Sequence, residues 1–208
     1  MSLINSDKET HPFMESVFDI IACRRSVRAF RQEQIAEEAL QAILGAGRAA
    51  PSGGNNRTTH LLVVQNPQVL SDLRALVETE FAAMEVDEHT YKSIRNSVAA
   101  SRRGGYEFFF RAPTLIVAAN RKDYGNAMAD SACVLENMMI AATALRVGSC
   151  WINQLHWLDG HAPIRAFLEK LGLSPEETIT GGLAMGYPAA ENAFRPLEKD
   201  GNPVTFIR

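Results

Sequence analysis

Three arginines and one serine lie within the segment Arg24-Arg25-Ser26-Val27-Arg28, and these side chains suit the binding of an anion. A guanidinium group presents its N–H donors in a planar fork that matches two oxygens of a phosphate group. Taken alone, the arginines also fit solvated cations that interact with the dipole at the end of a preceding helix. The segment therefore indicates an anion site, with surface cations as the alternative.

The loop from Ala50 to Asn56 contains residue types that let the backbone approach a ligand closely. It includes Pro51, Ser52, Gly53-Gly54 and Asn55. Proline and glycine end a helix, and glycine has no side chain to keep a ligand at a distance. On its own, this loop is typical of a helix stop. Combined with the arginines, it predicts a pocket for a phosphorylated, flat, electron-rich small molecule.

Length and composition narrow the class of protein. The chain has 208 residues, of which 46% are hydrophobic, and its net charge is −3. This length fits one domain with a sizeable core, and we predict a single domain over residues 1–208. A nearly neutral chain argues against a nucleic-acid partner or a polybasic membrane surface. The arginines therefore stand out against a neutral background.

The cysteines and the N-terminal segment indicate a cytoplasmic protein. Cys23, Cys133 and Cys150 are odd in number and far apart, which excludes a disulfide framework and a CxxC motif. Residues 1–12 are polar and do not resemble a signal peptide. His156 and His161 lack a third ligand, so no metal site is predicted.

Periodicity and turn residues define the elements that must position these side chains. The spacing of apolar residues predicts helices over residues 13–23, 34–49, 68–83, 129–147 and 163–171. The fourth helix is expected to be capped by Asp130 or Ser131 and to end at Gly148. It is apolar nearly all round, which is typical of a helix that also packs against a second subunit.

Short apolar runs predict strands over residues 60–65, 114–119 and 178–187, with a loop or short strand at 150–153. Residues 85–107 are charged and less regular, and we expect a mobile excursion or a cap. The tail, residues 189–208, lacks helical periodicity. Its apolar end, residues 203–207, is expected to pair as an edge strand in its own subunit or in a neighbour.

In order and spacing, four motifs resemble the FMN-dependent nitroreductase family. The resemblance covers residues 15–197, and the motifs are Arg24–Phe30, the Ala50–Asn55 loop before the His60 strand, Val147–Ile152 at the end of the central helix, and Met185–Pro188 with Arg195-Pro196 downstream. It implies an α+β three-layer sandwich with a mostly antiparallel sheet flanked by helices. It also implies an intertwined homodimer that shares two FMN sites at its interface.

The resemblance also implies a role for each matching residue. Arg24, Ser26 and Arg195 match positions that hold the phosphate and ribityl chain, and Arg25 matches a position along the FMN. Arg28 matches a basic position near the pyrimidine edge of the ring. The remaining matches are Pro51, Ser52 and Asn55, in a loop from the other subunit, and Ile152 and Asn153, beside flavin N5.

Three positions, in two places of the sequence, depart from the family pattern and bear on acceptor specificity. Thr59 stands where many relatives have tryptophan, and Asn153-Gln154 replaces a Glu-Gly pair.

A backbone N–H from residues 152–154 is the candidate donor to N5. Hydride transfer itself needs no side-chain nucleophile or base, because the flavin carries the redox chemistry. We therefore assign no catalytic residue.

The predicted function is transfer of electrons from NAD(P)H through FMN to nitroaromatic, quinone or related small acceptors by a ping-pong mechanism. Two alternatives remain open at this stage. One is a specialised flavin enzyme of the same fold, acting in ene reduction, dehalogenation or flavin destruction. The other is a flavin-binding protein without turnover.

Overall fold

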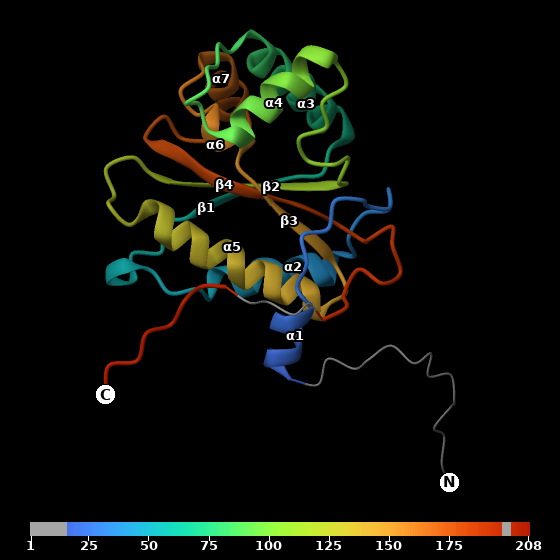
Figure 1. Cartoon of the computed structure of the whole chain (residues 1–208), viewed down its shortest axis with the longest axis vertical. Coiled ribbons are helices and arrows are strands. Elements are labelled where there is room, and N and C mark those ends of the chain that lie inside the picture. The colour runs from blue at the N-terminus through green and yellow to red at the C-terminus, as the bar shows by residue number, and fades with distance from the viewer. Residues whose placement is uncertain (1–15, 197–200) are drawn as a thin grey trace.

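A four-stranded antiparallel sheet runs through the middle of the molecule and separates two layers of helices (Figure 1). The computed structural model describes residues 16–196 and 201–208. The strands are β1 (His60–Val64), β2 (Thr114–Arg121), β3 (Gly148–Ile152) and β4 (Glu177–Gly186). Their order is β1-β2-β4-β3, and each neighbouring pair is antiparallel. This architecture confirms the predicted α+β sandwich.

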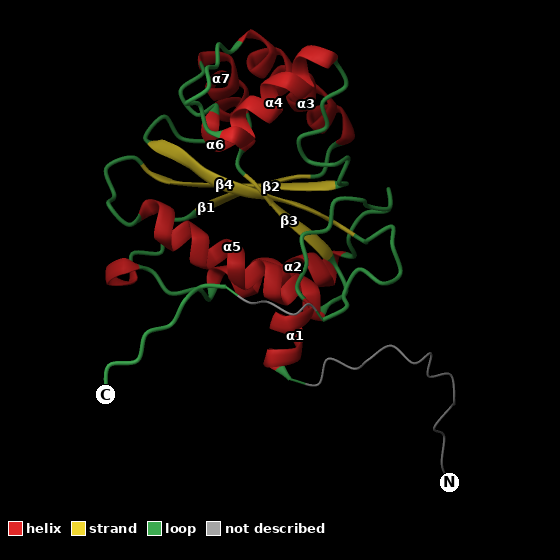
Figure 2. Cartoon of the chain, viewed as in Figure 1, coloured by secondary structure: helices red, strands yellow, loops and turns green. Residues whose placement is uncertain are grey.

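The helices divide between the two faces of the sheet (Figure 2). One face carries α1 (Val17–Cys23), α2 (Glu37–Arg48) and α5 (Ala127–Ala144). The opposite face carries α3 (Pro67–Ala83), α4 (Lys92–Arg103), α6 (Gln154–Trp157) and α7 (Ala162–Lys170). A short 3₁₀ turn, η1 (Gly53–Asn55), follows α2.

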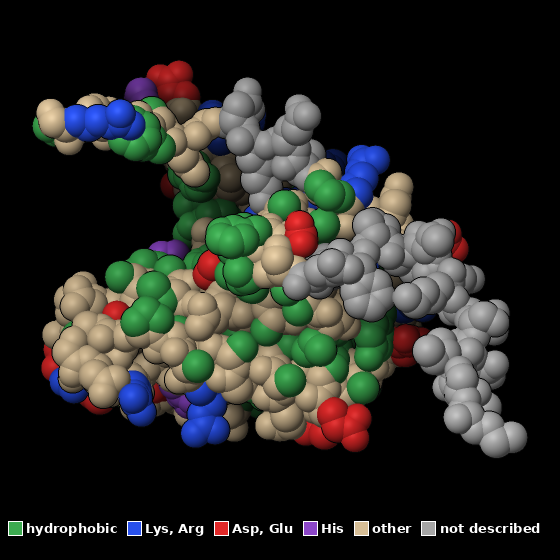
Figure 3. Space-filling view, turned by 90° about the horizontal axis from the view of Figure 1, so that it is seen from below, with side chains coloured by type: hydrophobic (Ala, Val, Ile, Leu, Met, Phe, Trp, Pro, Cys, Tyr) green, Lys and Arg blue, Asp and Glu red, His purple; other side chains and the backbone are tan. Residues whose placement is uncertain are grey.

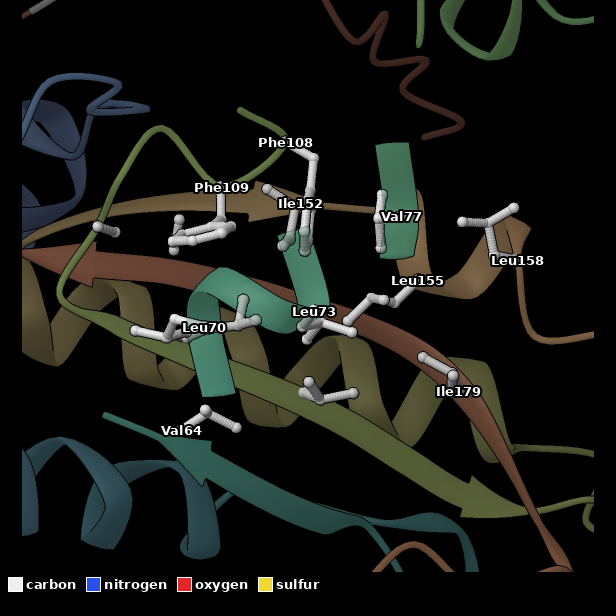
Figure 4. Close-up of a cluster of buried hydrophobic side chains, with 14 of the residues drawn as sticks. Val64, Leu70, Leu73, Val77, Phe108, Phe109, Ile152, Leu155, Leu158 and Ile179 are labelled. Atoms are coloured by element: carbon white, nitrogen blue, oxygen red, sulfur yellow. The ribbon is translucent and has the colours of Figure 1, made fainter. Parts of the chain in front are cut away.

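Each face of the sheet has its own hydrophobic core. Along β2, Leu115 and Val117 point toward the α3 layer, whereas Ile116 and Ala118 point toward α2 and α5. Because both faces are buried, β2 is a continuous apolar run without polar alternation. Figure 4 shows part of the first core, in which side chains of the sheet meet the helical layer; the labelled residues are Val64, Leu70, Leu73, Val77, Phe108, Phe109, Ile152, Leu155, Leu158 and Ile179.

The segment 85–107 contains a helix, α4, that the sequence analysis did not predict. Its buried positions include Ser97, Val98 and Ser101. The helix is polar on average, with lysine, arginine and serine at most positions, so its composition masks a face that is nevertheless packed. Its Ser97 hydroxyl donates to the Ser93 carbonyl oxygen at 3.1 Å, which satisfies a buried polar group within the helix.

The central helix α5 begins and ends earlier than predicted. Its N-cap is Asn126, which makes no side-chain capping bond, so the expected caps at Asp130 and Ser131 were wrong. The chain leaves the helix through Arg146, whose φ of 59° lies in the left-handed region. Gly148, the expected stop, instead begins β3. The left-handed conformation that often follows a helix, and that glycine favours, is thus adopted by Arg146, two residues before Gly148.

Two predicted features lie at the chain ends. Helix α1 begins at Val17, where Ser16 and Asp19 form a capping box; residues 13–15 of the expected helix lie outside the described residues. In the C-terminal tail, residues 203–207 form no strand in the single chain and are exposed. Pairing of that tail with a neighbour stays a prediction.

Among the described residues, no helix is long and apolar enough to span a membrane.

Gly182 of β4 is a position where close packing requires glycine. A Cβ there would lie 2.6 Å from the carbonyl oxygen of Ile116 on the adjacent strand. We expect Gly182→Ala to lower the free energy of unfolding by about 1–3 kcal/mol because a backbone atom must move. Urea denaturation checks this expectation.

Gly45 provides the matched control, since a Cβ at this position in α2 would meet no atom within 4 Å. Gly45→Ala should raise the free energy of unfolding by about 0.5–1 kcal/mol through its higher helix propensity. Equal urea midpoints for Gly182→Ala and the parent protein would contradict the packing argument.

Candidate functional site

Three of the predicted arginines line one cleft at the edge of the sheet. Arg25, Ser26 and Arg28 follow α1, and Arg195 follows β4. The cleft has a volume of about 220 Å³ and is completed by Val27, Ala29, Pro188, Ala190, Asn192 and Ala193. Guanidinium groups that converge on one cleft form a site for an anionic group. The structure therefore brings together four of the predicted site residues.

Backbone hydrogen bonds hold the arginine segment against the sheet. The Val27 N–H donates to the Ser149 carbonyl oxygen of β3 at 2.9 Å. Further along, the Arg31 N–H donates to the Tyr187 carbonyl oxygen at 2.8 Å, and the Ala189 N–H donates to the Ala29 carbonyl oxygen at 3.0 Å. The segment is thus fixed to both β3 and the chain that leaves β4.

Side-chain alternation in this extended segment directs the polar groups outward. Val27 is buried against Gly148, where a Cβ would lie 2.9 Å from the valine Cγ1. Its neighbours Ser26 and Arg28 are exposed and line the cleft. Extended backbone places successive side chains on opposite sides, so burial of Val27 orients the hydroxyl and the guanidinium toward the cleft.

Arg25 carries a buried polar atom that the protein does not satisfy. Its Nη1 is buried and has no hydrogen-bond partner among the described residues. Buried polar groups are nearly always paired, and a charged donor has the most to gain from an anion. Arg25 is also one of the residues that line the cleft, so a phosphate group bound there would lie beside this guanidinium, and the residues present fit a phosphorylated ligand.

Arg28 lies between the cleft and the aromatic side chain of Phe110. Its guanidinium carbon is 5.9 Å from the centre of that ring. Phe110 and the next residue, Arg111, both have left-handed φ angles, 59° and 55°. Such strain in non-glycine residues is typical of functional regions. Phe110 is thus a contact of the site that was not among the predicted site residues.

Cys150 lies beneath the cleft and does not act as a nucleophile. Burial raises the pKa of its thiol, and the nearby Arg28, Ser26 and Arg24 only partly offset this shift. The thiol is therefore protonated at neutral pH, and the thiolate is the reactive form. Cys150 is therefore a buried core residue.

Arg24 points toward α5 and is not among the residues that line the cleft. Its Nε lies 3.7 Å from Glu136 Oε1, and the Glu136 side chain is 49% exposed. An ion pair of this length with an exposed partner contributes little stability. The role of Arg24 in phosphate binding stays a prediction.

The predicted loop with Pro51, Ser52 and Asn55 lies elsewhere in the chain. The Gly53 N–H donates to the carboxylate of Asp130, in the first turn of α5, at 3.0 and 3.2 Å. By contrast, the arginine segment packs at Gly148, beyond the other end of that helix. An 18-residue helix spans about 27 Å. One chain therefore does not bring this loop to the cationic cleft.

Asp130 and Tyr124 hold this loop in a strained shape. The Tyr124 hydroxyl lies 2.8 Å from Asp130 Oδ2 and 2.9 Å from the Gly53 carbonyl oxygen. Gly54, Asn55 and Arg57 all have left-handed φ angles, of 59°, 56° and 53°. Asp130 was expected to cap α5, and no sequence signal links it to a loop so distant along the chain.

Ile152 ends the strand that begins beside the cleft, and Asn153 follows it as the N-cap of α6. Ile152 is buried, and Asn153 Oδ1 accepts a 2.7 Å hydrogen bond from the Trp151 indole N–H. Neither residue lines the cleft. From Gly148 to Ile152 the strand advances roughly 13 Å. An anion at one end and a flat ring at the other would therefore require an elongated ligand that follows β3.

A family model and a solved structure both relate this chain to the same protein family. The model of the Nitroreductase family matches residues 21–187. A solved structure described as a nitroreductase with bound FMN, from Bacteroides fragilis, is 33% identical; the match covers 94% of this chain and 100% of that chain, with a TM-score of 0.80.

Two curated relatives are each 25% identical to the chain. A 4-nitrobenzoate reductase from a Nocardioides species matches over 94% of this chain and 92% of its own length. An NADPH-flavin oxidoreductase from Vibrio harveyi matches over 88% of this chain and 70% of its own length.

The Asp130 contact can be tested through stability. Asp130→Ala leaves the Gly53 N–H without its carboxylate acceptor, and we expect the free energy of unfolding to fall by about 1–3 kcal/mol. Asp123→Ala is the matched control, because Asp123 is exposed and pairs only with the exposed Arg121; it should change stability by less than about 0.5 kcal/mol. Similar thermal midpoints for the two variants would contradict the role given to Asp130.

Proposed function

Because the chain belongs to the nitroreductase family, we propose that it is an FMN-dependent oxidoreductase that takes electrons from NAD(P)H and passes them to small acceptors. The single observation that carries this proposal is the cleft in which three arginines converge and Arg25 Nη1 lacks a partner. Nitroaromatic compounds, quinones and related electron-poor molecules are the proposed acceptors. The names of the relatives support both the cofactor and this acceptor class.

The residues of the cleft would hold the phosphate end of FMN. Arg25 and Arg195 supply guanidinium donors, and Ser26 supplies a hydroxyl. Arg24, beside them, would assist by leaving its loose pair with Glu136. Arg28 would lie near the pyrimidine edge of the ring, where a fixed cation stabilises negative charge on the reduced flavin. When bound, FMN supplies the acceptance and return of a hydride.

The far end of β3 would contact the ring. Ile152 presents an apolar side chain and Asn153 a backbone N–H at the point where the strand ends. We assign a ping-pong order, in which NAD(P)H gives up its hydride and NAD(P)+ leaves before the acceptor enters the same face. No protein nucleophile takes part, and the protonated state of Cys150 is compatible with that assignment.

A homodimer would complete the site. In one chain, the loop with Pro51, Ser52 and Asn55 lies beyond the opposite end of α5 from the cleft, so a second subunit is the source that we propose for it. Helix α1 also exposes a set of apolar side chains: Val17 (54%), Phe18 (78%) and Ile21 (44%). Figure 3 shows hydrophobic side chains on the face of the molecule that carries α1, α2 and α5. Apolar groups gathered on one surface are typical of an interface.

Spectroscopy tests the cofactor and the electron donor. The purified protein incubated with FMN should show the absorbance of bound oxidised flavin, and NADH or NADPH should bleach it without oxygen. Adding a nitroaromatic compound should then restore the colour. A protein that binds no FMN, or whose flavin neither nucleotide bleaches, would overturn the proposal.

Arg25→Met tests the anion site. Loss of a charge-assisted hydrogen bond of about 1.5–3 kcal/mol should weaken FMN binding by about 10- to 100-fold. Arg103→Met is the matched control, because Arg103 is exposed in the last turn of α4 and does not line the cleft. Fluorescence titration measures both dissociation constants. Equal FMN affinities in the two variants would remove Arg25 from the site.

Phe18→Glu tests the dimer. A carboxylate on the exposed apolar face of α1 should shift the protein from dimer to monomer in sedimentation velocity, since its burial without a partner is unfavourable. Leu171→Glu, at the end of α7 on the other side of the sheet, should leave the dimer intact. If the parent protein sediments as a monomer while it binds FMN, the shared site is wrong.

A further inference from the structure

A chain of hydrogen bonds joins the end of β3 to helix α4. Gln154 Oε1 accepts from the backbone N–H of Asn153 at 3.2 Å, and Gln154 Nε2 donates to the Tyr106 hydroxyl oxygen at 3.0 Å. The Tyr106 hydroxyl lies 2.8 Å from Ser97 Oγ. Ser97 in turn donates to the Ser93 carbonyl oxygen at 3.1 Å.

The direction of every bond in this chain follows from the number of protons available. A serine hydroxyl has one proton, and that of Ser97 is used by the Ser93 carbonyl oxygen, which can only accept. Tyr106 must therefore donate to Ser97, and its oxygen is left to accept from the Gln154 amide. This fixes the Gln154 nitrogen toward Tyr106 and its carbonyl oxygen toward the Asn153 N–H.

The far end of the chain is anchored in the protein interior. Ser97 is buried, and the Tyr106 ring meets the buried Phe81 edge-on, with ring centres 6.2 Å apart. The Tyr106 backbone N–H donates to Glu78 Oε1 at 2.9 Å, a bond that lowers the pKa of the Glu78 carboxyl. Gln154 is therefore held by a fixed partner, so its carbonyl oxygen remains beside the Asn153 N–H.

The Asn153 side chain is also held in place, which leaves the backbone N–H as the group able to change partners. Its Oδ1 accepts the short bond from the Trp151 indole N–H. A backbone N–H can be shared between two acceptors that lie within reach. At this position the internal acceptor is Gln154 Oε1, and the second would be a ligand atom beside the end of β3.

We propose that Gln154, oriented by Tyr106, serves as an alternative acceptor for the Asn153 N–H when the bound flavin is reduced. The proposal rests on the FMN function given above. In oxidised flavin, N5 has a lone pair that accepts a hydrogen bond. Reduction adds a hydride from NAD(P)H to N5; the nicotinamide loses two electrons and the flavin gains them.

After reduction, N5 carries a hydrogen and no longer accepts a bond from Asn153. The backbone N–H would then be left unpaired unless another acceptor lies nearby. Gln154 Oε1, at 3.2 Å, provides that acceptor without movement of the main chain. Gln154 and Tyr106 are therefore positioning residues that favour the reduced state relative to a site without them.

The test measures the reduction potential of bound FMN in Gln154→Met and Tyr106→Phe. Methionine keeps the length of the side chain but removes the amide, and phenylalanine removes only the hydroxyl. In Gln154→Met, we expect binding of reduced FMN to weaken about tenfold relative to oxidised FMN. For a two-electron couple this lowers the potential by about 30 mV. Tyr106→Phe should shift the potential in the same direction by a smaller amount.

Tyr91→Phe is the matched control, because Tyr91 precedes the same helix and its side chain is exposed. Its potential should equal that of the parent protein. In the protein without FMN, hydrogen exchange of the Asn153 amide should be faster in Gln154→Met than in the parent or the control. A potential that is unchanged or raised in Gln154→Met, or unchanged amide exchange, would overturn the proposal while FMN binding persists. Failure to bind FMN at all would overturn the proposed function, and this inference with it.

Discussion

The short backbone ladder between the arginine segment and the sheet is the constraint on which the rest of the site depends. It joins Val27 to Ser149, and residues 29–31 to residues 187–189. Guanidinium groups on flexible side chains repel one another, and only a fixed backbone keeps several of them on one cleft. The ladder does this with ordinary main-chain hydrogen bonds, so the exposed side chains remain free to contact a ligand. Burial of Val27 against Gly148 then decides which side chains face the cleft.

The same ladder defines a direction along β3. Its first residues lie beside the cationic cleft, and its last residues lead into Asn153 and the Gln154 amide. The length of β3 suits an elongated ligand that has a phosphate at one end and a flat ring at the other. The chemistry of the ligand and the length of the strand thus support the same placement, although the groups at the two ends share no contact.

The strands and most helices could be predicted from the sequence because their apolar patterns are local. The run in β2 is a clear example, since burial on both faces leaves no polar interruption. Helix α4 was not predicted in the same way, because its composition is strongly polar and its packed face includes Ser97 and Ser101. Arg25, Ser26 and Arg28 were singled out by residue type, whereas Arg195 was assigned only through the family resemblance. The Asp130 contact with Gly53 was not predicted, because it joins residues far apart in the chain and neither residue type implies it.

The internal acceptor at Asn153 is connected by hydrogen bonds to a segment of the chain that does not line the arginine cleft. Helix α4 and Tyr106 belong to residues 85–107, a region with little recognisable sequence pattern. Tyr106 nevertheless fixes the orientation of Gln154, a position where the sequence departs from the pattern implied by the family resemblance. A glycine there has no side chain and cannot offer an acceptor to the preceding N–H. Glutamine at this position therefore has a chemical consequence only because Tyr106 holds its amide in place.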